Sequence, residues 1–433
     1  MKLYSTANRN ATATFEEAVV RGMADDGGLY MPSTFPMFPR EFFRSLGEYS
    51  FQETSFRVAK ALIEDEIPDE ALRGIVDGAI SFPAPVHRLD SCTGVLELFH
   101  GPTLAFKDFG ARFMARTLAY FKRNEKHAST ILVATSGDTG SAVAHGFLNL
   151  EGFSVVLLYP SRRVSAIQEL QLTTVGGNVT ALEIDGTFDD CQQLVKQAFR
   201  DPLLSSTKSL TSANSINIAR LLPQSFYYFQ AYAQIPEKDK PVLFSVPSGN
   251  FGNLTAGLMA WKMGLPVRRF IAATNVNDVV PKYLATGVFN PAPAIATLSN
   301  AMDVGNPNNL PRIVALFGGS LPDLRKTLYA ASYTDQETRE TIAEVYSRYG
   351  YILDPHGAVG YRALQCYGQG NSEPHCGIVL ETAHPAKFPD AYDEAMRQSL
   401  EVPERLQALL RGTKHSIKLP ADFKEFKEFL IAT

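Results

Sequence analysis

Hydrophobic positions recur at helical spacing through the first eighty residues of the chain. Apolar side chains at positions 56, 58, 59, 61, 62 and 63 fall on one side of a helix, and those at 71, 72, 75 and 76 on one side of another. This spacing predicts amphipathic helices. A proline-rich stretch at 82–85 then interrupts the pattern. We therefore expect a separate, mostly helical N-terminal domain over residues 1–94.

Apolar runs then alternate with helical patterns. The runs predict strands at 130–134, 154–158 and 179–184, and the segments between and around them predict helices at 110–123, 141–150, 165–175 and 188–199. Alternating strands and helices are typical of a parallel α/β layer. We expect one α/β lobe over residues 95–235.

A second series of the same kind begins at residue 242. Strands are predicted at 242–246, 269–273 and 377–380, with a helix after Asn253, a long helix at 335–348 and further helices toward the C-terminus. This predicts a second α/β lobe over residues 236–433. The fold class is thus α/β, with two open lobes that place ligands at the carboxyl ends of their strands.

Composition narrows the class of protein. The chain has 433 residues, of which 45% are hydrophobic and 20% charged, and a formal net charge of −4. Mixed charges without a basic patch disfavour nucleic acid and anionic membranes as partners. The start of the chain lacks an apolar leader and no long apolar run follows, so we expect a cytoplasmic protein. Four scattered cysteines without metal-ligand spacing predict free thiols and no metal site.

Lys107 stands between two phenylalanines behind a Gly-Pro turn, in the segment 98–110. A poorly solvated lysine has a lowered pKa, and a neutral amine can attack an aldehyde to form a Schiff base. Lys107 is therefore a candidate covalent anchor for a cofactor. The alternative is an ordinary amphipathic helix start, with Phe106 and Phe109 in the core and the lysine reaching to water.

Two apolar runs break into glycine loops that precede helices. The first loop spans 135–140 and the second 247–253. Free amides at such a helix start favour an anion or carboxylate, and the second loop suits a small phosphate. Neither loop has a Walker or Gly-x-Gly-x-x-Gly pattern, which argues against nucleotide binding. Each loop taken alone could equally be an ordinary strand-to-helix turn.

Five ordered motifs resemble the threonine synthase family, fold type II enzymes that depend on pyridoxal phosphate and have a tryptophan synthase β-like fold. The motifs lie at 100–108, 134–140, 215–217, 247–252 and 382–388. The long extension before Lys107, together with Asp138 in its loop, is similar to the branch found in many proteobacteria and fungi. One position departs from the family pattern, because Asn253 stands where Asp is most often expected. This change removes a negative charge beside the expected phosphate.

The resemblance implies that pyridoxal phosphate is held by Lys107 as a Schiff base. The freed lysine amine would then carry protons at the substrate's Cα. The cofactor phosphate is expected on a single loop, formed by Gly249, Asn250, Phe251, Gly252 and Asn253. The hydroxyl of Thr382 is expected to face the pyridine nitrogen. The residue pattern alone would favour a threonine that ends a strand and caps a turn.

The resemblance also implies O-phospho-L-homoserine as the substrate. Its α-carboxylate is expected on the loop formed by Ser136, Gly137, Asp138 and Thr139. We expect Asp138 to turn away and brace this loop, since two carboxylates repel. Candidates for the substrate phosphate are Arg112, Arg162, Arg220, Asn217 and Lys282, although each arginine could equally form a surface ion pair. His100 and His384 are better read as hydrogen-bonded histidines beside turns.

The implied reaction removes the Cα and then a Cβ proton, expels phosphate from Cγ, adds water at Cβ and reprotonates Cγ and Cα, giving L-threonine. The expected protein is a monomer or homodimer. A related lyase or dehydratase that releases a keto acid would share Lys107 and both loops. A paralogue that binds the cofactor or a phospho-metabolite without turnover is a more remote alternative, because it would be expected to lack the lysine or an intact loop.

Overall fold

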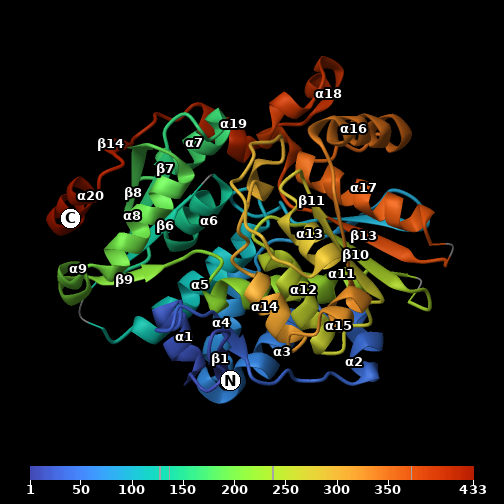
Figure 1. The fold of residues 1–433 in the computed structure, drawn as a ribbon, viewed down its shortest axis with the longest axis horizontal. Helices are drawn as coiled ribbons and strands as arrows, with labels where there is room; N and C mark the ends of the chain where they lie inside the picture. The colour runs from blue at the N-terminus through green and yellow to red at the C-terminus, as the bar shows by residue number, and fades with distance from the viewer. Residues whose placement is uncertain (126–127, 136, 237, 372) are drawn as a thin grey trace.

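Two α/β lobes stand side by side above the first part of the chain (Figure 1). The structure is a computed structural model, and it describes residues 1–433 except 126–127, 136, 237 and 372. The α/β fold class and the two lobes agree with the sequence prediction. The predicted strands and helices form with slightly different ends.

The N-terminal part is mostly helical, as predicted, but it also contains a small antiparallel sheet of order β2-β1-β3. Its helices are α1 (Phe15–Arg21), α2 (Arg40–Ser45), α3 (Phe51–Ile63) and α4 (Asp69–Ala79), and its strands are β1 (Leu3–Ser5), β2 (Thr12–Ala13) and β3 (Tyr30–Pro32). Ser50 caps α3 by accepting the Glu53 N–H. Helix α4 packs on α5 of the first lobe. These short strands carry no alternating pattern long enough to predict them.

The first lobe is built on a parallel five-stranded sheet of order β14-β8-β7-β6-β9. Its strands are β6 (Ser129–Ala134), β7 (Phe153–Pro160), β8 (Val179–Asp185), β9 (Ser209–Ser212) and β14 (Ile417–Pro420). Its helices are α5 (Lys107–Lys122), α6 (Asp138–Phe147), α7 (Ala166–Thr173), α8 (Phe188–Arg200), α9 (Pro202–Thr207) and α20 (Phe423–Ala432). The sequence grouped residues 236–433 in the second lobe, whereas β14 pairs with β8 and α20 packs on α8. The end of the chain thus returns to the first lobe, as Figure 1 shows.

The second lobe is built on a six-stranded sheet of order β12-β11-β10-β13-β5-β4, in which β4 alone runs antiparallel to its neighbour. Its strands are β4 (Val86–Arg88), β5 (Thr93–Glu97), β10 (Val242–Pro247), β11 (Arg269–Thr274), β12 (Leu328–Ser332) and β13 (Cys376–Glu381). Its helices are α11 (Phe226–Ala233), α12 (Gly252–Lys262), α13 (Val279–Thr286), α14 (Leu310–Leu316), α15 (Leu321–Thr327), α16 (Asp335–Tyr349), α17 (Pro355–Gln369) and α18 (Glu394–Ser399). Helices α10 (Ile218–Leu221) and α19 (Glu404–Leu410) pack on α5 and α7 of the first lobe. Strand β5 precedes Lys107 in the chain but belongs to this sheet.

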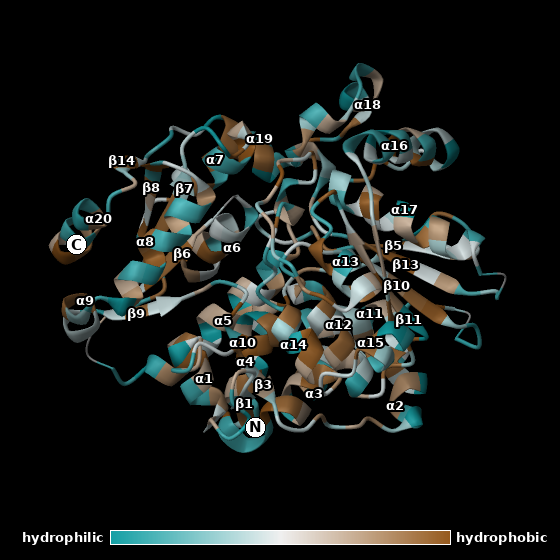
Figure 2. Ribbon diagram, viewed as in Figure 1, coloured by the Kyte–Doolittle hydropathy of each residue, from teal (hydrophilic) through white to brown (hydrophobic). Residues whose placement is uncertain are grey.

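The central strands of both sheets are buried on both faces. Every residue of β10 and of β13 is buried, which is typical of parallel sheets covered by helices on each side. Figure 2 shows the apolar residues gathered in the interior, along the strands and the inner sides of the helices. None of the described helices is long and apolar enough to cross a membrane.

Parallel pairing brings the predicted motifs to one edge of the six-stranded sheet. Strands β10 and β13 are neighbours, and β5 is the next neighbour of β13. The loop 248–251 follows β10, Thr382 follows β13, and the segment leading to Lys107 follows β5. All three therefore leave the sheet at its carboxyl edge, where ligands bind in this class of fold.

Candidate active site

Lys107 is the first residue of α5 and lies beside the segment that follows β13. The main-chain N–H of Phe106 donates to the carbonyl oxygen of Thr382 at 2.9 Å. An antiparallel bridge between Ala105 and Ala383 adds to this pairing. The segments that contain Lys107 and Thr382 therefore lie side by side.

The turn before α5 is braced by the buried carboxylate of Asp108. This carboxylate accepts the main-chain N–H of Thr103 at 2.8 Å and the Thr103 hydroxyl at 2.7 Å. Burial raises the pKa of Asp108 to about 6, while the two hydrogen bonds act in the opposite direction. These contacts hold the entrance of α5 and, with it, the direction in which Lys107 leaves the helix.

The surroundings of the half-buried Lys107 make its amine easier to deprotonate than an ordinary lysine. Burial lowers the pKa of Lys107 to about 8, with the positive charges of Lys387 and Arg220 contributing and the negative charge of Asp138 opposing. The ring of Phe106 lies 5.9 Å from Nζ. Desolvation disfavours the ammonium form. The sequence expectation of a poorly solvated lysine therefore agrees with its environment.

The loop after β10 turns sharply into α12. Phe251 adopts a left-handed conformation with φ +60°, and Gly252 begins the helix. Asn309 holds the loop from outside, because its main-chain N–H and its Nδ2 donate to the Asn250 carbonyl at 3.3 and 3.0 Å. The first N–H groups of a helix have no partner within it and attract anions. The start of α12 can therefore receive a phosphate.

Asn253 presents a buried donor at this helix start. The hydroxyls of Tyr227 and Tyr228 both donate to Asn253 Oδ1 at 2.7 Å. The amide Nδ2 is buried and hydrogen-bonds to none of the described residues. A buried donor without a partner costs free energy unless a ligand accepts from it. The residue that departs from the family pattern thus adds an N–H donor next to the phosphate loop.

The glycine loop of the first lobe packs tightly against α7. Gly137 has φ +135°, which side chains rarely tolerate, and a Cβ added there would lie 2.5 Å from Cδ of Gln168. The hydroxyl of Thr135 accepts the N–H groups of Gly137 and Gly140 at 3.0 and 2.8 Å. Thr139 is half-buried in the first turn of α6. Ser136, the remaining residue predicted for this loop, lies outside the described residues.

Asp138 forms a buried ion pair with Lys387, and its negative charge also acts on Lys107. Lys387 Nζ donates to Asp138 Oδ1 at 2.6 Å and to the Thr103 carbonyl at 3.1 Å. Gln168 Nε2 also donates to Asp138 Oδ1, at 3.2 Å. The charge of Lys387 helps to hold the pKa of Asp138 far below its usual range despite burial. These contacts join the glycine loop to α7 and to the segment that follows β13.

The arginines and Asn217 occupy very different surroundings. Arg112 is held by the N-terminal domain, because it donates to the carbonyls of Gly78 and Ala79 at 2.7 and 3.2 Å. Arg162 is exposed in the turn after β7. The side chain of Asn217 is consumed by structural contacts, since Oδ1 caps α10 and Nδ2 donates to the Val19 carbonyl at 2.9 Å. The contacts of Arg112 and Asn217 are therefore structural and account for these two side chains without a bound ligand.

Arg220 differs from the other candidates because it is 3% exposed and forms no salt bridge among the described residues, although the charge of Asp108 acts on it. One guanidinium nitrogen donates to the Ala213 carbonyl. Its Nε is buried and has no partner among the described residues. Burial lowers the pKa of Arg220 to about 10. Lys282, by contrast, forms an exposed ion pair with Asp278.

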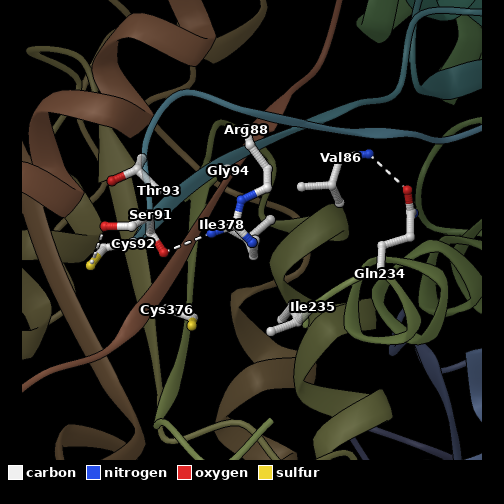
Figure 3. A pocket seen from close by; sticks show the side chains of 10 residues that line it. All are labelled: Val86, Arg88, Ser91, Cys92, Thr93, Gly94, Gln234, Ile235, Cys376 and Ile378. Atoms are coloured by element: carbon white, nitrogen blue, oxygen red, sulfur yellow. Dashed lines mark hydrogen bonds between the residues drawn. The ribbon is translucent and has the colours of Figure 1, made fainter. Parts of the chain in front are cut away.

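A small pocket lies at the amino edge of the six-stranded sheet, opposite the edge that carries the Lys107 and Thr382 segments (Figure 3). It is lined by residues at the amino ends of β5 and β13, among them Thr93 and Cys376. The Val86 N–H donates to Gln234 Oε1 at 2.9 Å across its wall. None of the residues predicted for catalysis or binding lines this pocket, so the site at the carboxyl edge is distinct from it.

Comparison with known proteins connects this geometry to a family. The model of pyridoxal-phosphate dependent enzymes matches residues 84–380, and models of the N-terminal and C-terminal parts of threonine synthase match 2–80 and 357–430. Threonine synthase from Serratia marcescens is 47% identical over 100% of this chain and 99% of its own length. The chain belongs to the threonine synthase family. It is a fold type II enzyme that depends on pyridoxal phosphate.

Solved structures of the threonine synthase family have the same fold. The Escherichia coli threonine synthase superposes with a TM-score of 0.92 at 46% identity, covering 100% of both chains. The threonine synthase from Brucella melitensis, solved with bound pyridoxal phosphate, gives a TM-score of 0.92 at 36% identity and covers 99% of this chain and 98% of that one. The two-lobed arrangement is thus that of the family.

The residues at the carboxyl edge fit this cofactor. A phosphate would accept from the first turn of α12 and from the unpartnered Nδ2 of Asn253. The lowered pKa of Lys107 raises the fraction of neutral amine, the form that attaches to an aldehyde. Both features are present in the chain itself, independent of the comparison.

Several residues that build the site were not singled out from the sequence. Lys387 lies in the motif 382–388, but the sequence alone indicates no role for it, and none of the motifs indicates a role for Gln168, Asp354 or His356. Asp354 followed by Pro355 does carry a local signal, that of a helix N-cap followed by proline at the first helical position. Nothing local to the sequence shows that these side chains reach Asp138, Thr382 or the phosphate loop.

Proposed function

We propose that this enzyme converts O-phospho-L-homoserine and water to L-threonine and phosphate. The observation that carries the proposal is the pairing of the Lys107 segment with the Thr382 segment, next to the phosphate loop on the neighbouring strand. Membership of the threonine synthase family supports the substrate. The buried cation Arg220 also suits a substrate that carries a phosphate.

Each residue has a stated task in this proposal. When bound, pyridoxal phosphate supplies an electron sink for negative charge that develops on the substrate. Lys107 attaches the cofactor and, once released, its neutral amine takes the proton from the substrate's Cα and later returns one. The loop 249–252 and Asn253 hold the cofactor phosphate, while Thr382 faces the ring nitrogen as a neutral partner.

In this proposal the substrate is held mainly by the first lobe, which carries the glycine loop. Main-chain and hydroxyl groups at Gly137 and Thr139, together with Ser136, receive its α-carboxylate, while Asp138 remains paired with Lys387. Arg220 binds the substrate phosphate, because a buried guanidinium without a carboxylate partner is stabilised by an anionic ligand. Arg112, Arg162 and Asn217 are left out of the proposed site because of their surroundings.

The proposal extends to assembly and location. We expect the enzyme to act in the cytoplasm as a monomer or homodimer. The described residues form no disulfide, which fits a reducing compartment. Size-exclusion chromatography with light scattering measures the oligomeric state.

Product analysis tests the proposed reaction. The enzyme loaded with pyridoxal phosphate is incubated with O-phospho-L-homoserine in heavy water, and the products are identified by proton and phosphorus NMR. Deuterated L-threonine with equimolar phosphate is expected. A keto acid with ammonia and phosphate would instead identify a lyase on the same scaffold, and unreacted substrate would contradict the proposal.

A further inference from the structure

Asp354 connects the end of β13 to the start of α17. Its Oδ2 accepts the main-chain N–H groups of Thr382 and Ala383, each at 3.2 Å. Its Oδ1 accepts the main-chain N–H and the Nδ1 of His356, each at 2.6 Å. Asp354 is fully buried. The position of Thr382 is therefore tied directly to His356.

His356 extends this connection to another loop. Its Nε2 accepts the main-chain N–H of Ala301 at 3.2 Å. A ring nitrogen that accepts carries no proton, so the neutral tautomer with its proton on Nδ1 satisfies both partners. The ring is 2% exposed and packs edge-on against Phe388, with centroids 5.1 Å apart. His356 thus holds Asp354 and Ala301 at a fixed separation.

Ala301 lies directly on the phosphate loop. A Cβ added to Gly249 would lie 2.6 Å from the Ala301 carbonyl oxygen and 2.8 Å from Met302 Cα. Only glycine allows this close approach. The contacts therefore run without a break from Thr382, through Asp354 and His356, to Ala301 and Gly249.

We propose that His356 is a positioning residue that couples the Thr382 end of the cofactor site to its phosphate end at Gly249. The inference rests on the proposed function, which places the cofactor's ring nitrogen at one end and its phosphate at the other. Sheet pairing fixes the strands β10 and β13, but both anchors lie beyond the last paired residues. Beyond the paired residues, the hydrogen bonds of His356 fix the positions of the two anchors relative to each other.

Two substitutions separate the hydrogen bonds of His356. In His356→Asn, the side-chain amide can still donate to Asp354 but is too short to reach Ala301. In His356→Gln, the longer side chain can still accept from Ala301, while the main-chain N–H of residue 356 still donates to Asp354 and keeps the connection intact. A third variant, Ala301→Pro, removes the N–H donor and leaves residue 356 unchanged. Ala301 lies in the first turn of a short 3-10 helix, Asn300–Met302, where proline is tolerated.

The readouts are the rate of cofactor release from the loaded enzyme, followed by its visible absorbance, and the phosphorus NMR signal of the bound phosphate. Loss of one hydrogen bond predicts about fivefold faster release in His356→Asn. It also predicts a shifted or broadened phosphorus signal, although His356 does not touch the loop's helix start. His356→Gln should stay within about twofold of the parent. The exposed His87, substituted in His87→Asn, is the matched control and should change neither readout.

A double-variant comparison decides whether the two residues act through one contact. Ala301→Pro should release the cofactor as fast as His356→Asn, and the double variant should be no faster than either. Equal release by His356→Asn and His356→Gln, or effects that multiply in the double variant, would overturn the inference. If His356→Asn does not fold, Ala301→Pro decides by the same measurement. Failure of the parent to form threonine, with this release pattern intact, would instead refute only the proposed reaction.

Discussion

Lys387 and Asp138 form a buried ion pair that joins the two lobes at the candidate active site. Lys387 Nζ lies 2.6 Å from Asp138 Oδ1, and the two side chains are 0% and 4% exposed. Lys387 follows β13 of the six-stranded sheet, whereas Asp138 opens α6 of the other lobe. The carbonyl of Thr103, in the turn before Lys107, accepts a second hydrogen bond from the same ammonium.

Removing one partner of this pair should be strongly destabilising. Lys387→Met leaves the Asp138 carboxylate buried without a counter-charge, and we expect the free energy of unfolding to fall by about 3–5 kcal/mol. Denaturant unfolding of the cofactor-free protein measures the change. The double variant Lys387→Met with Asp138→Asn should recover much of the loss, because no unpaired charge remains. A double variant that loses the sum of both single effects would contradict this account.

The lowered pKa of Lys107 predicts how cofactor binding depends on pH. The neutral amine is the reactive form, so the rate at which cofactor-free protein takes up pyridoxal phosphate should rise with pH. Because the pKa of Lys107 is about 8, the midpoint should lie near that pH and the rate should level off above it. Stopped-flow absorbance at a series of pH values provides the profile. A midpoint near the ordinary lysine value of about 10.4 would show that burial does not tune this amine.

Arg220 and Arg112 offer a matched pair of arginine substitutions. Arg220→Gln removes the proposed phosphate contact, so KM for O-phospho-L-homoserine should rise about tenfold or more, as expected for a lost hydrogen bond to a charged group. Arg112→Gln breaks contacts with the N-terminal domain and should lower the unfolding midpoint with little change in KM. Steady-state phosphate release measures KM. Equal KM values for Arg220→Gln and the parent would exclude Arg220 from the substrate site.

Asn253→Asp tests the donor at the phosphate loop. The substituted carboxylate keeps acceptors for Tyr227 and Tyr228 but replaces the unpartnered N–H group with a negative charge. We expect about tenfold weaker binding of pyridoxal phosphate near neutral pH, from the lost charge-assisted hydrogen bond. Equilibrium titration of the cofactor-free protein measures the affinity. Unchanged affinity would place Nδ2 away from the cofactor phosphate.

Local sequence patterns predicted the elements around the site better than the contacts within it. The apolar run before residue 135 and the glycine loop after it are neighbours in sequence, so strand β6 and helix α6 could be anticipated. The same holds for β10 and α12. The small N-terminal sheet and the return of β14 to the first lobe depend on long-range pairing that no local pattern carries.

The site residues divide in the same way. Lys107 could be singled out as a candidate because the phenylalanines and the turn that lower its solvation are its neighbours in sequence. Asn217 could not be separated from a ligand-binding residue, because its partner Val19 lies far away in the chain. Lys387 and His356 were missed because their partners, Asp138 and Ala301, come from distant segments.

The most direct test of the whole account is to identify the lysine that carries the cofactor. The loaded enzyme is reduced with borohydride, digested, and its peptides are analysed by mass spectrometry. The account predicts the reduced cofactor on the peptide that contains Lys107, and its loss in Lys107→Ala with the fold retained. Reduced cofactor on Lys387 or any other lysine, or its persistence in Lys107→Ala, would contradict the assignment of the active site.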